Sequence, residues 1–328
     1  MSTKLSILMS RKKLYLLVLV ALTVIAPYIL PSYALHIVIL FYIWATIAQA
    51  WNLLGGYIKE VSFGHAAFFG IGAYAAALLT LKPKYWEAGL KIMFRGIVPP
   101  QMFILTIIAA GIAAAFFALI IGYPLLLLKG PYFTIATLGL TTILRVIVLD
   151  KSEWTYGAGG IVLPTGAFDV SVHYYTSLIL FAVAMFVIYR MVTGKFGYAS
   201  RAIGDDEISA SAFGINVMKF KLIALVVSAF FTGMAGGCWA HFIYYIHPYN
   251  TFVDTISLEA VVMCVLGGIG TLTGPLIGTF LLIALREALA GFLYVHLLIL
   301  AIILIVCCIA MPGGVSAFIK RKLKVSWL

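Results

Sequence analysis

The chain is 328 residues long, and 64% of its residues are hydrophobic while only 10% are charged. With a mean hydropathy of +1.12, it has too few polar side chains to cover a water-soluble domain of this size, so a soluble globular class is excluded. The net charge of +11 does not indicate a nucleic-acid binder, because the basic residues flank apolar runs and form no interleaved patch. A polytopic membrane protein is expected.

Apolar runs on the scale of a transmembrane helix, roughly 20 residues, recur along the whole chain. In order they are 14–30, 34–53, 62–81, 102–128, 132–149, 174–191, 222–242, 258–266, 276–289 and 292–310. The first follows a basic cluster but precedes no small-residue cleavage site, which predicts a retained helix. We therefore expect an all-α protein with about ten transmembrane helices in two related halves, forming a single transmembrane domain over residues 1–328.

The orientation is predicted from where Lys and Arg collect, since cytoplasmic loops carry the excess of positive charge. Basic residues gather at 4–13, at 190–221 and at 320–324, which places both termini and this long loop in the cytoplasm. An even number of spans is then required, in agreement with ten. The basic residues at 82–95 fall on the outer side, but the inner excess is larger.

Two glycine-rich stretches interrupt apolar runs: "GGYIKEVSFGHAAFFGIGAY" at 55–74 and "VLGGIGTLTGPLIGTF" at 265–280. A broken helix is tolerated in a bilayer only where its freed backbone groups face protein or a water-filled cavity. Each stretch also carries small residues four apart, which let helices approach closely. These rows are Ser62, Ala66, Gly70 and Gly270, Gly274, Gly278. Helix packing alone would explain them, but their occurrence in both halves favours a transport site between repeats.

Polar residues inside the first stretch raise two alternatives. Lys59 and Glu60 lie either at the inner membrane surface, which their position before a new span favours, or in a central cavity. For His65, a hydrogen bond to a neighbouring helix is favoured over substrate binding or proton relay. A third glycine cluster at 154–164 suits a tight turn on the outer side, flanked by interfacial aromatic residues. The candidates for the translocation path are Lys59, Glu60, Ser62, Gly64, His65, Gly157, Gly159, Gly270 and Gly274.

The loop at 190–221 is long enough to form structure of its own. Residues 199–212 can form one or two short amphipathic helices, with acidic residues fit to cap one of them and Gly214 as a stop signal. Since a plain connection could be far shorter, something is expected to dock here. The four cysteines lie in apolar segments without metal-ligand spacing, so no metal site is expected.

Five segments in order resemble the LivM-type permease subunits of branched-chain amino acid ABC importers: 55–74, 128–145, "YGAGGI", 201–237 and 265–280. The resemblance spans nearly the whole chain. It implies a second related permease, two cytoplasmic ATPase subunits, an extracytoplasmic substrate-binding protein and a lipid environment in a prokaryotic plasma (inner) membrane. It also implies that a coupling loop at about 192–220 sits on an ATPase, through Arg201, Asp205, Asp206, Glu207, Ala210 and Gly214.

The chain lacks a G-x-x-x-x-G-K-[ST] motif, so we expect no bound cofactor, and partner subunits would use the ATP. The family pattern is close to G-Y-A-G-Q-L-S-L-G-H where this chain has "GYIKEVSFGH", which leaves urea or a short-chain amide as alternative cargo. A proton-coupled secondary transporter would use Glu60 and His65 as a proton pair. A membrane enzyme is disfavoured because Asp254 and Glu259 share no helical face and Arg286 is expected to pair with Glu287.

Overall fold

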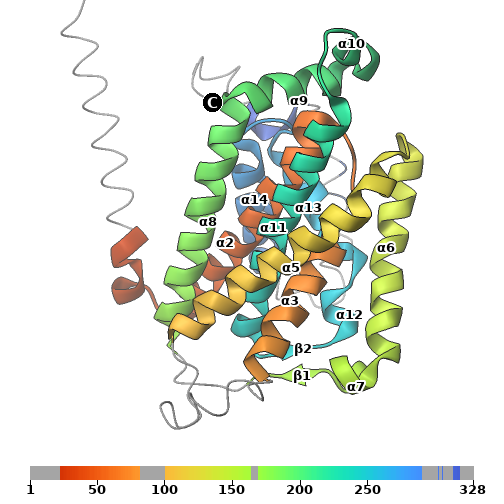
Figure 1. Cartoon of the computed structure of the whole chain (residues 1–328). Coiled ribbons are helices and arrows are strands. Elements are labelled where there is room, and N and C mark those ends of the chain that lie inside the picture. Colours follow the sequence, from red (N-terminus) through yellow and green to blue (C-terminus); the bar gives the residue numbers. More distant parts are fainter. Residues whose placement is uncertain are drawn as a thin grey trace, which may run out of the picture.

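The computed structural model describes residues 23–81, 100–163, 169–289, 302, 305 and 313–317. Its long helices form a bundle (Figure 1). In the first half, α2 (Ser32–Trp51) runs into a π-helix, η1 (Asn52–Ile58), and α3 (His65–Leu81), α5 (Pro100–Leu126) and α6 (Pro131–Asp150) follow. The short elements α7 (Ser152–Thr155), η3 (Gly157–Gly159) and β1 (Ile161–Val162) then lead to α8 (Val170–Thr193).

The second half begins with two short helices, α9 (Lys195–Asp205) and α10 (Glu207–Ala212). The long α11 (Val217–Ile243), β2 (Tyr245–Ile246), α12 (Pro248–Thr251), α13 (Asp254–Gly267) and α14 (Gly274–Leu289) follow. The strands β1 and β2 pair antiparallel, with Ile161 opposite Ile246.

The described part of the chain contains six helices long and apolar enough to cross a membrane, and α3 is a shorter apolar helix. The expected spans from 34–53 to 276–289 coincide with α2 and η1, α3, α5, α6, α8, α11, α13 and α14. The first and last expected spans lie largely outside the described residues, so the count of ten and the two related halves stay predictions. An all-α polytopic membrane protein is confirmed at this coarser level.

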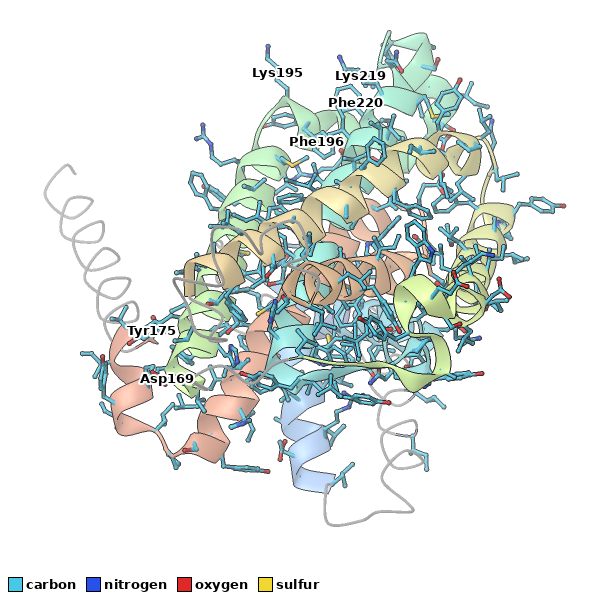
Figure 2. The ribbon with its side chains drawn as sticks, turned by 60° about the horizontal axis from the view of Figure 1, so that its bottom comes forward. Asp169, Tyr175, Lys195, Phe196, Lys219 and Phe220 are labelled. Atoms are coloured by element: carbon cyan, nitrogen blue, oxygen red, sulfur yellow. The ribbon has the colours of Figure 1, made fainter. Side chains whose placement is uncertain are left out.

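The bundle has two distinct ends. Figure 1 shows α9 and α10 at one end and α7, β1 and β2 at the other. Lys195 and Lys219 extend from the α9 end beside Phe196 and Phe220, whose ring centroids are 5.8 Å apart (Figure 2). These two basic residues therefore lie at the α9 end of the bundle, and its cytoplasmic orientation stays a prediction.

The core centres on α11, which packs against α3 and α5. Its crossing with α3 is close because glycines face backbone: a Cβ on Gly236 would lie 2.2 Å from the carbonyl oxygen of Phe69. A Cβ on Gly72 would lie 2.1 Å from the carbonyl oxygen of Gly233. Small residues at such crossings let the helix backbones pack closely. This van der Waals packing holds the helices together, because the hydrophobic effect gives little attraction between helices within a bilayer.

The substitution Gly236→Ala should therefore lower stability, since backbone of α3 would have to move away. We expect a loss of about 1 to 3 kcal/mol in the free energy of unfolding. Gly139→Ala is the matched control, because a Cβ on Gly139 meets no atom within 4 Å among the described residues. Thermal unfolding of the purified variants in detergent measures both, and equal stability of the two would contradict this packing.

Candidate functional site

A non-helical segment separates η1 from α3. Helical backbone stops at Ile58 and resumes at His65. The helix leaves its regular path through a π-turn, and Lys59 adopts the left-handed conformation with φ 65°. Only a few per cent of residues other than glycine adopt a positive φ, so this geometry marks a local constraint. The backbone groups between the two helices must find partners outside a helix.

Polar side chains of two other helices supply many of those partners. On α6, Thr137 Oγ1 accepts a hydrogen bond from the Phe63 N–H at 3.1 Å, and Thr134 Oγ1 donates to the Val61 carbonyl at 2.9 Å. On α13, Ser257 Oγ donates to the Phe63 carbonyl at 2.6 Å and accepts from the backbone N–H of α3 at 2.8 Å. Side chains of α6 and α13 thus satisfy backbone groups of the break.

A second interruption separates α13 from α14. Gly268 and Gly270 both have positive φ, at 124° and 71°. A Cβ on Gly278 would lie 1.7 Å from the carbonyl oxygen of Met263, and one on Gly274 would lie 2.1 Å from that of Gly268. The small residues in this stretch therefore let α14 pack directly on the backbone of α13 and of the loop between the two helices.

The two interruptions contact each other through Asn52. Its Oδ1 accepts from the Gly270 N–H at 2.9 Å, and its Nδ2 donates to the Thr271 carbonyl at 2.8 Å. Gln49 Nε2 donates to the Leu272 carbonyl at 2.5 Å. The close approach also needs Gly56, since a Cβ there would lie 2.8 Å from the Gly270 nitrogen. The structure thus brings the two glycine stretches together at one place.

Asn52 and Gln49 were missed by the sequence interpretation. Both are fully buried in the helix that precedes the first break. The signal that could have found them is two amide side chains three residues apart within an apolar run, because a buried amide needs hydrogen-bond partners.

His65 begins α3 and its side chain is fully buried. Neither ring nitrogen has a hydrogen-bond partner among the described residues. Its ring instead contacts Phe68 edge-on, with centroids 6.0 Å apart. The expected hydrogen bond to a neighbouring helix is therefore not found in this part of the chain.

The charged residues before the break contact the loop helices. Lys59 Nζ lies 2.8 Å from Asp205 Oδ1 at the surface. Lys221 Nζ of α11 lies 2.5 Å from Glu60 Oε1 and also binds Glu207. Among the described residues, no ion pair or hydrogen bond joins Glu60 to His65.

The loop helices have the predicted local features. Asp206 is the N-cap of α10, accepting from the Ser209 N–H at 2.5 Å, and this hydrogen bond lowers the pKa of the Asp206 carboxyl. Gly214 has φ +83° just beyond the helix, which confirms the stop signal. Ala210 is buried, and the Arg201 guanidinium lies over the Tyr57 ring at 5.8 Å.

Gly157 and Gly159 lie elsewhere. They form η3 at the end of the bundle that carries α7 and β1, opposite α9 and α10 (Figure 1). Gly157 has φ +49°, which suits the tight turn expected there. These two glycines are therefore not brought together with the two helix breaks.

The expected pairing of Arg286 with Glu287 is wrong. Arg286 instead forms an ion pair with Glu259 of α13, while Glu287 accepts a hydrogen bond from Tyr33. Neighbouring residues on a helix point in different directions, so each charge reaches a different partner.

Among the described residues, no cluster of three His, Cys, Asp or Glu side chains could hold a metal ion.

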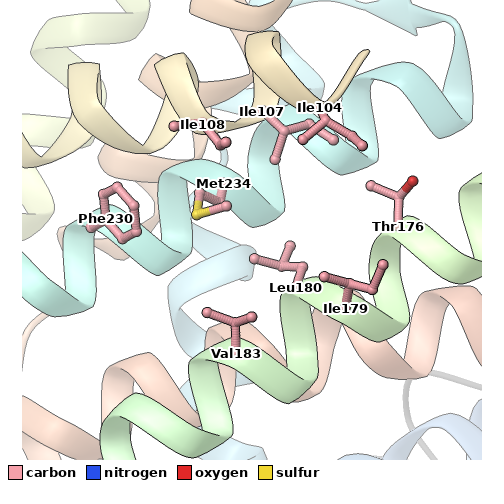
Figure 3. A pocket seen from close by; sticks show the side chains of 9 residues that line it. All are labelled: Ile104, Ile107, Ile108, Thr176, Ile179, Leu180, Val183, Phe230 and Met234. Carbon is pink, nitrogen blue, oxygen red and sulfur yellow. The ribbon is translucent and has the colours of Figure 1, made fainter. Parts of the chain in front are cut away.

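An apolar hollow of about 340 Å³ lies between α5, α8 and α11 (Figure 3). Its lining is aliphatic and aromatic apart from Met234 and Thr176. A zwitterionic or strongly polar cargo would lose its hydration there without gaining partners, so this hollow does not suit such a cargo. The meeting of the two helix breaks, with backbone polar groups close by, is the better candidate site.

The contact between the breaks predicts the effect of Asn52→Leu. The Gly270 N–H and the Thr271 carbonyl would lose their partners, which should cost about 1 to 3 kcal/mol in the free energy of unfolding. Thr176→Val is the control, because among the described residues Thr176 donates only to the Val172 carbonyl of its own helix. Chemical unfolding in detergent compares the two variants, and equal losses would refute the structural role of Asn52.

Comparisons with known proteins identify related permeases. The chain is 28% identical to the high-affinity branched-chain amino acid permease protein LivM of Escherichia coli, over 96% of this chain and 77% of that protein. It is 25% identical to LivH of Salmonella typhimurium over 76% of this chain and 82% of that protein. It is 34% identical to the guanosine ABC transporter permease NupQ of Bacillus subtilis, over 20% of this chain and 21% of that one.

The comparison with solved structures finds no match. A family model described as "branched-chain amino acid transport system / permease component" matches residues 33–308, which include both helix breaks and the loop helices. The chain therefore belongs to the family of permease components of branched-chain amino acid transport systems.

Proposed function

We propose that this chain is the membrane permease subunit of an ABC importer that moves branched-chain amino acids inward. The observation that carries the proposal is the family match over residues 33–308. The described chain adds a physical basis: two interrupted helices that meet inside a membrane domain, which is where transporters bind cargo. The permease itself would make and break no covalent bond.

The proposed assembly places a second related permease beside this chain in the plasma membrane. Two ATPase subunits would bind at the α9 end in the cytoplasm, with both termini on that side, and a binding protein would deliver cargo at the α7 and β1 end. Exposed apolar side chains on and beside α9 and α10 support docking at the first of these ends. They are Tyr198, Ile208 and Phe213, of which Phe213 is 88% exposed.

In the proposed cycle, ATP-driven closure of the ATPases moves the segment from Arg201 to Gly214. The segment that carries Ser62 and Gly64, together with the start of α3 at His65, would then shift against the loop that carries Gly270 and the start of α14 at Gly274, alternately opening each side. Small side chains leave room for an aliphatic cargo, while freed backbone groups offer partners to its ammonium and carboxylate groups. Neither ring nitrogen of His65 has a hydrogen-bond partner among the described residues, so this buried ring would bind a polar group that enters between these elements.

The alternatives have less support. The relatives that match most of this chain are named for branched-chain amino acid transport, which favours that cargo over urea or a short-chain amide. A proton-coupled secondary transporter would need Glu60 and His65 to exchange a proton. Glu60 instead pairs with Lys221, and among the described residues it makes no ion pair or hydrogen bond with His65.

The direct test is uptake by proteoliposomes that hold this chain with its partner permease, ATPases and binding protein. Labelled leucine and labelled urea are offered in parallel. We expect leucine uptake that requires ATP and stops when the ATPase subunits lack their phosphate-binding lysine. Uptake of urea alone would contradict the proposed cargo, and uptake by this chain alone under a proton gradient would overturn the ABC assignment.

A further inference from the structure

Two ionic contacts join the end of the first broken helix to the loop helices. We call residues Lys59 and Glu60, which follow η1, the elbow. Lys59 pairs with Asp205 at the end of α9, and both side chains are largely exposed. Glu60 pairs with Lys221 of α11, and Lys221 also pairs with Glu207 of α10. The elbow therefore forms an ion pair with α9 directly and is linked to α10 through Lys221.

The second contact is buried, which makes it the stronger constraint. The side chain of Lys221 is only 3% exposed and that of Glu60 only 10%. A buried ammonium is tolerated only when carboxylates or other acceptors surround it, and removing one partner leaves the others without compensation. Without Lys221, the carboxylates of Glu60 and Glu207 would face each other with no cation between them. Exposed pairs such as Lys59 and Asp205 contribute much less.

Backbone packing holds the same surfaces together. A Cβ on Gly204 of α9 would lie 2.7 Å from the carbonyl oxygen of Tyr57 in η1. The Arg201 guanidinium covers the ring of Tyr57. Helix α9 therefore lies directly on η1, and η1 carries Gly56, which contacts the Gly270 loop of the second break. Helix α9 is therefore connected to both breaks through the directly packed residues of η1.

We propose that Lys221, with Glu60 and Glu207, forms a buried ionic link through which movement of α9 and α10 is transmitted to the broken helix. The pair of Lys59 with Asp205 is a second, weaker link at the surface. These are positioning residues, and they contact neither nucleotide nor cargo. The inference rests on the proposed function, because it gives the loop helices a route to the site where cargo would pass.

The first experiment compares Lys221→Met with Lys219→Met in the complete transporter in proteoliposomes. Met keeps much of the side-chain length but removes the charge. Lys219 lies two residues before Lys221 near the start of α11, is exposed, and has no ion pair among the described residues. We expect Lys221→Met to lower the cargo moved per ATP hydrolysed at least fivefold, and Lys219→Met to change it less than twofold.

A link that transmits motion differs from one that only stabilises the fold. If Lys221→Met lowers transport and ATP hydrolysis in the same proportion, the residue is merely structural and the proposal is wrong. The proposal is also wrong if the Lys221→Met transporter moves cargo at the normal rate and the cargo moved per ATP hydrolysed is unchanged.

The surface pair is tested by reversing its charges. Asp tolerates the left-handed conformation of residue 59 better than most residues, so Lys59→Asp is the suitable change. Each single variant, Lys59→Asp or Asp205→Lys, puts like charges side by side. Each should lower the cargo moved per ATP hydrolysed by up to about fivefold. The double variant restores an opposite pair and should recover most of the loss. No recovery would refute the surface link.

Hydrogen exchange separates this inference from the proposed function, since it needs no cargo. In the assembled complex, Lys221→Met should speed amide exchange of residues 195–212 at least tenfold, while Lys219→Met should not. Faster exchange in a complex that takes up no leucine would support the link and contradict the proposed function. Unchanged exchange would overturn the link even if the wild-type complex imports leucine.

Discussion

A chain segment that leaves the helical conformation inside a packed bundle needs hydrogen-bond partners outside its own helix, and those partners decide how the neighbouring elements are arranged. Between Ile58 and His65 those partners come from α6 and α13, with Thr137 and Ser257 as the central side chains. The second break, around Gly270, is satisfied in part by Asn52 of the first. Each interruption is thus stabilised by elements distant in sequence, and Asn52 joins the two by hydrogen bonds.

This mutual support suggests why polar and charged residues gather so close to the broken helix. The amides at the break satisfy backbone, whereas the charges of the elbow face the other way, toward α9 and α10. Polar side chains in a membrane domain are costly, and here each set bridges elements that a transport cycle would move relative to one another. In the proposed function, the loop helices would receive force from the ATPases and the pair of helix breaks would respond.

Much of this could be predicted from the sequence where the signal is local. Composition indicated a membrane protein, glycine clusters marked both interruptions, and Asp206 and Gly214 marked the limits of a loop helix. Pairing across the fold could not be predicted, because Lys59 and Asp205 are 146 residues apart and nothing local indicates their contact. Asn52 and Gln49 were hidden in an apolar run, and Arg286 reached Glu259 because neighbouring helical side chains diverge.

The central claim is that the loop helices, the elbow and the two breaks move as one connected unit. Structures of the complete transporter, determined without nucleotide and with ATP bound to hydrolysis-deficient ATPases, test it most directly. The account predicts that α9, α10 and the elbow shift together while Lys221 keeps both carboxylate partners, and that the contact of Gly56 with Gly270 changes between the two states. If α9 and α10 move while the elbow and this contact stay fixed, the account is wrong.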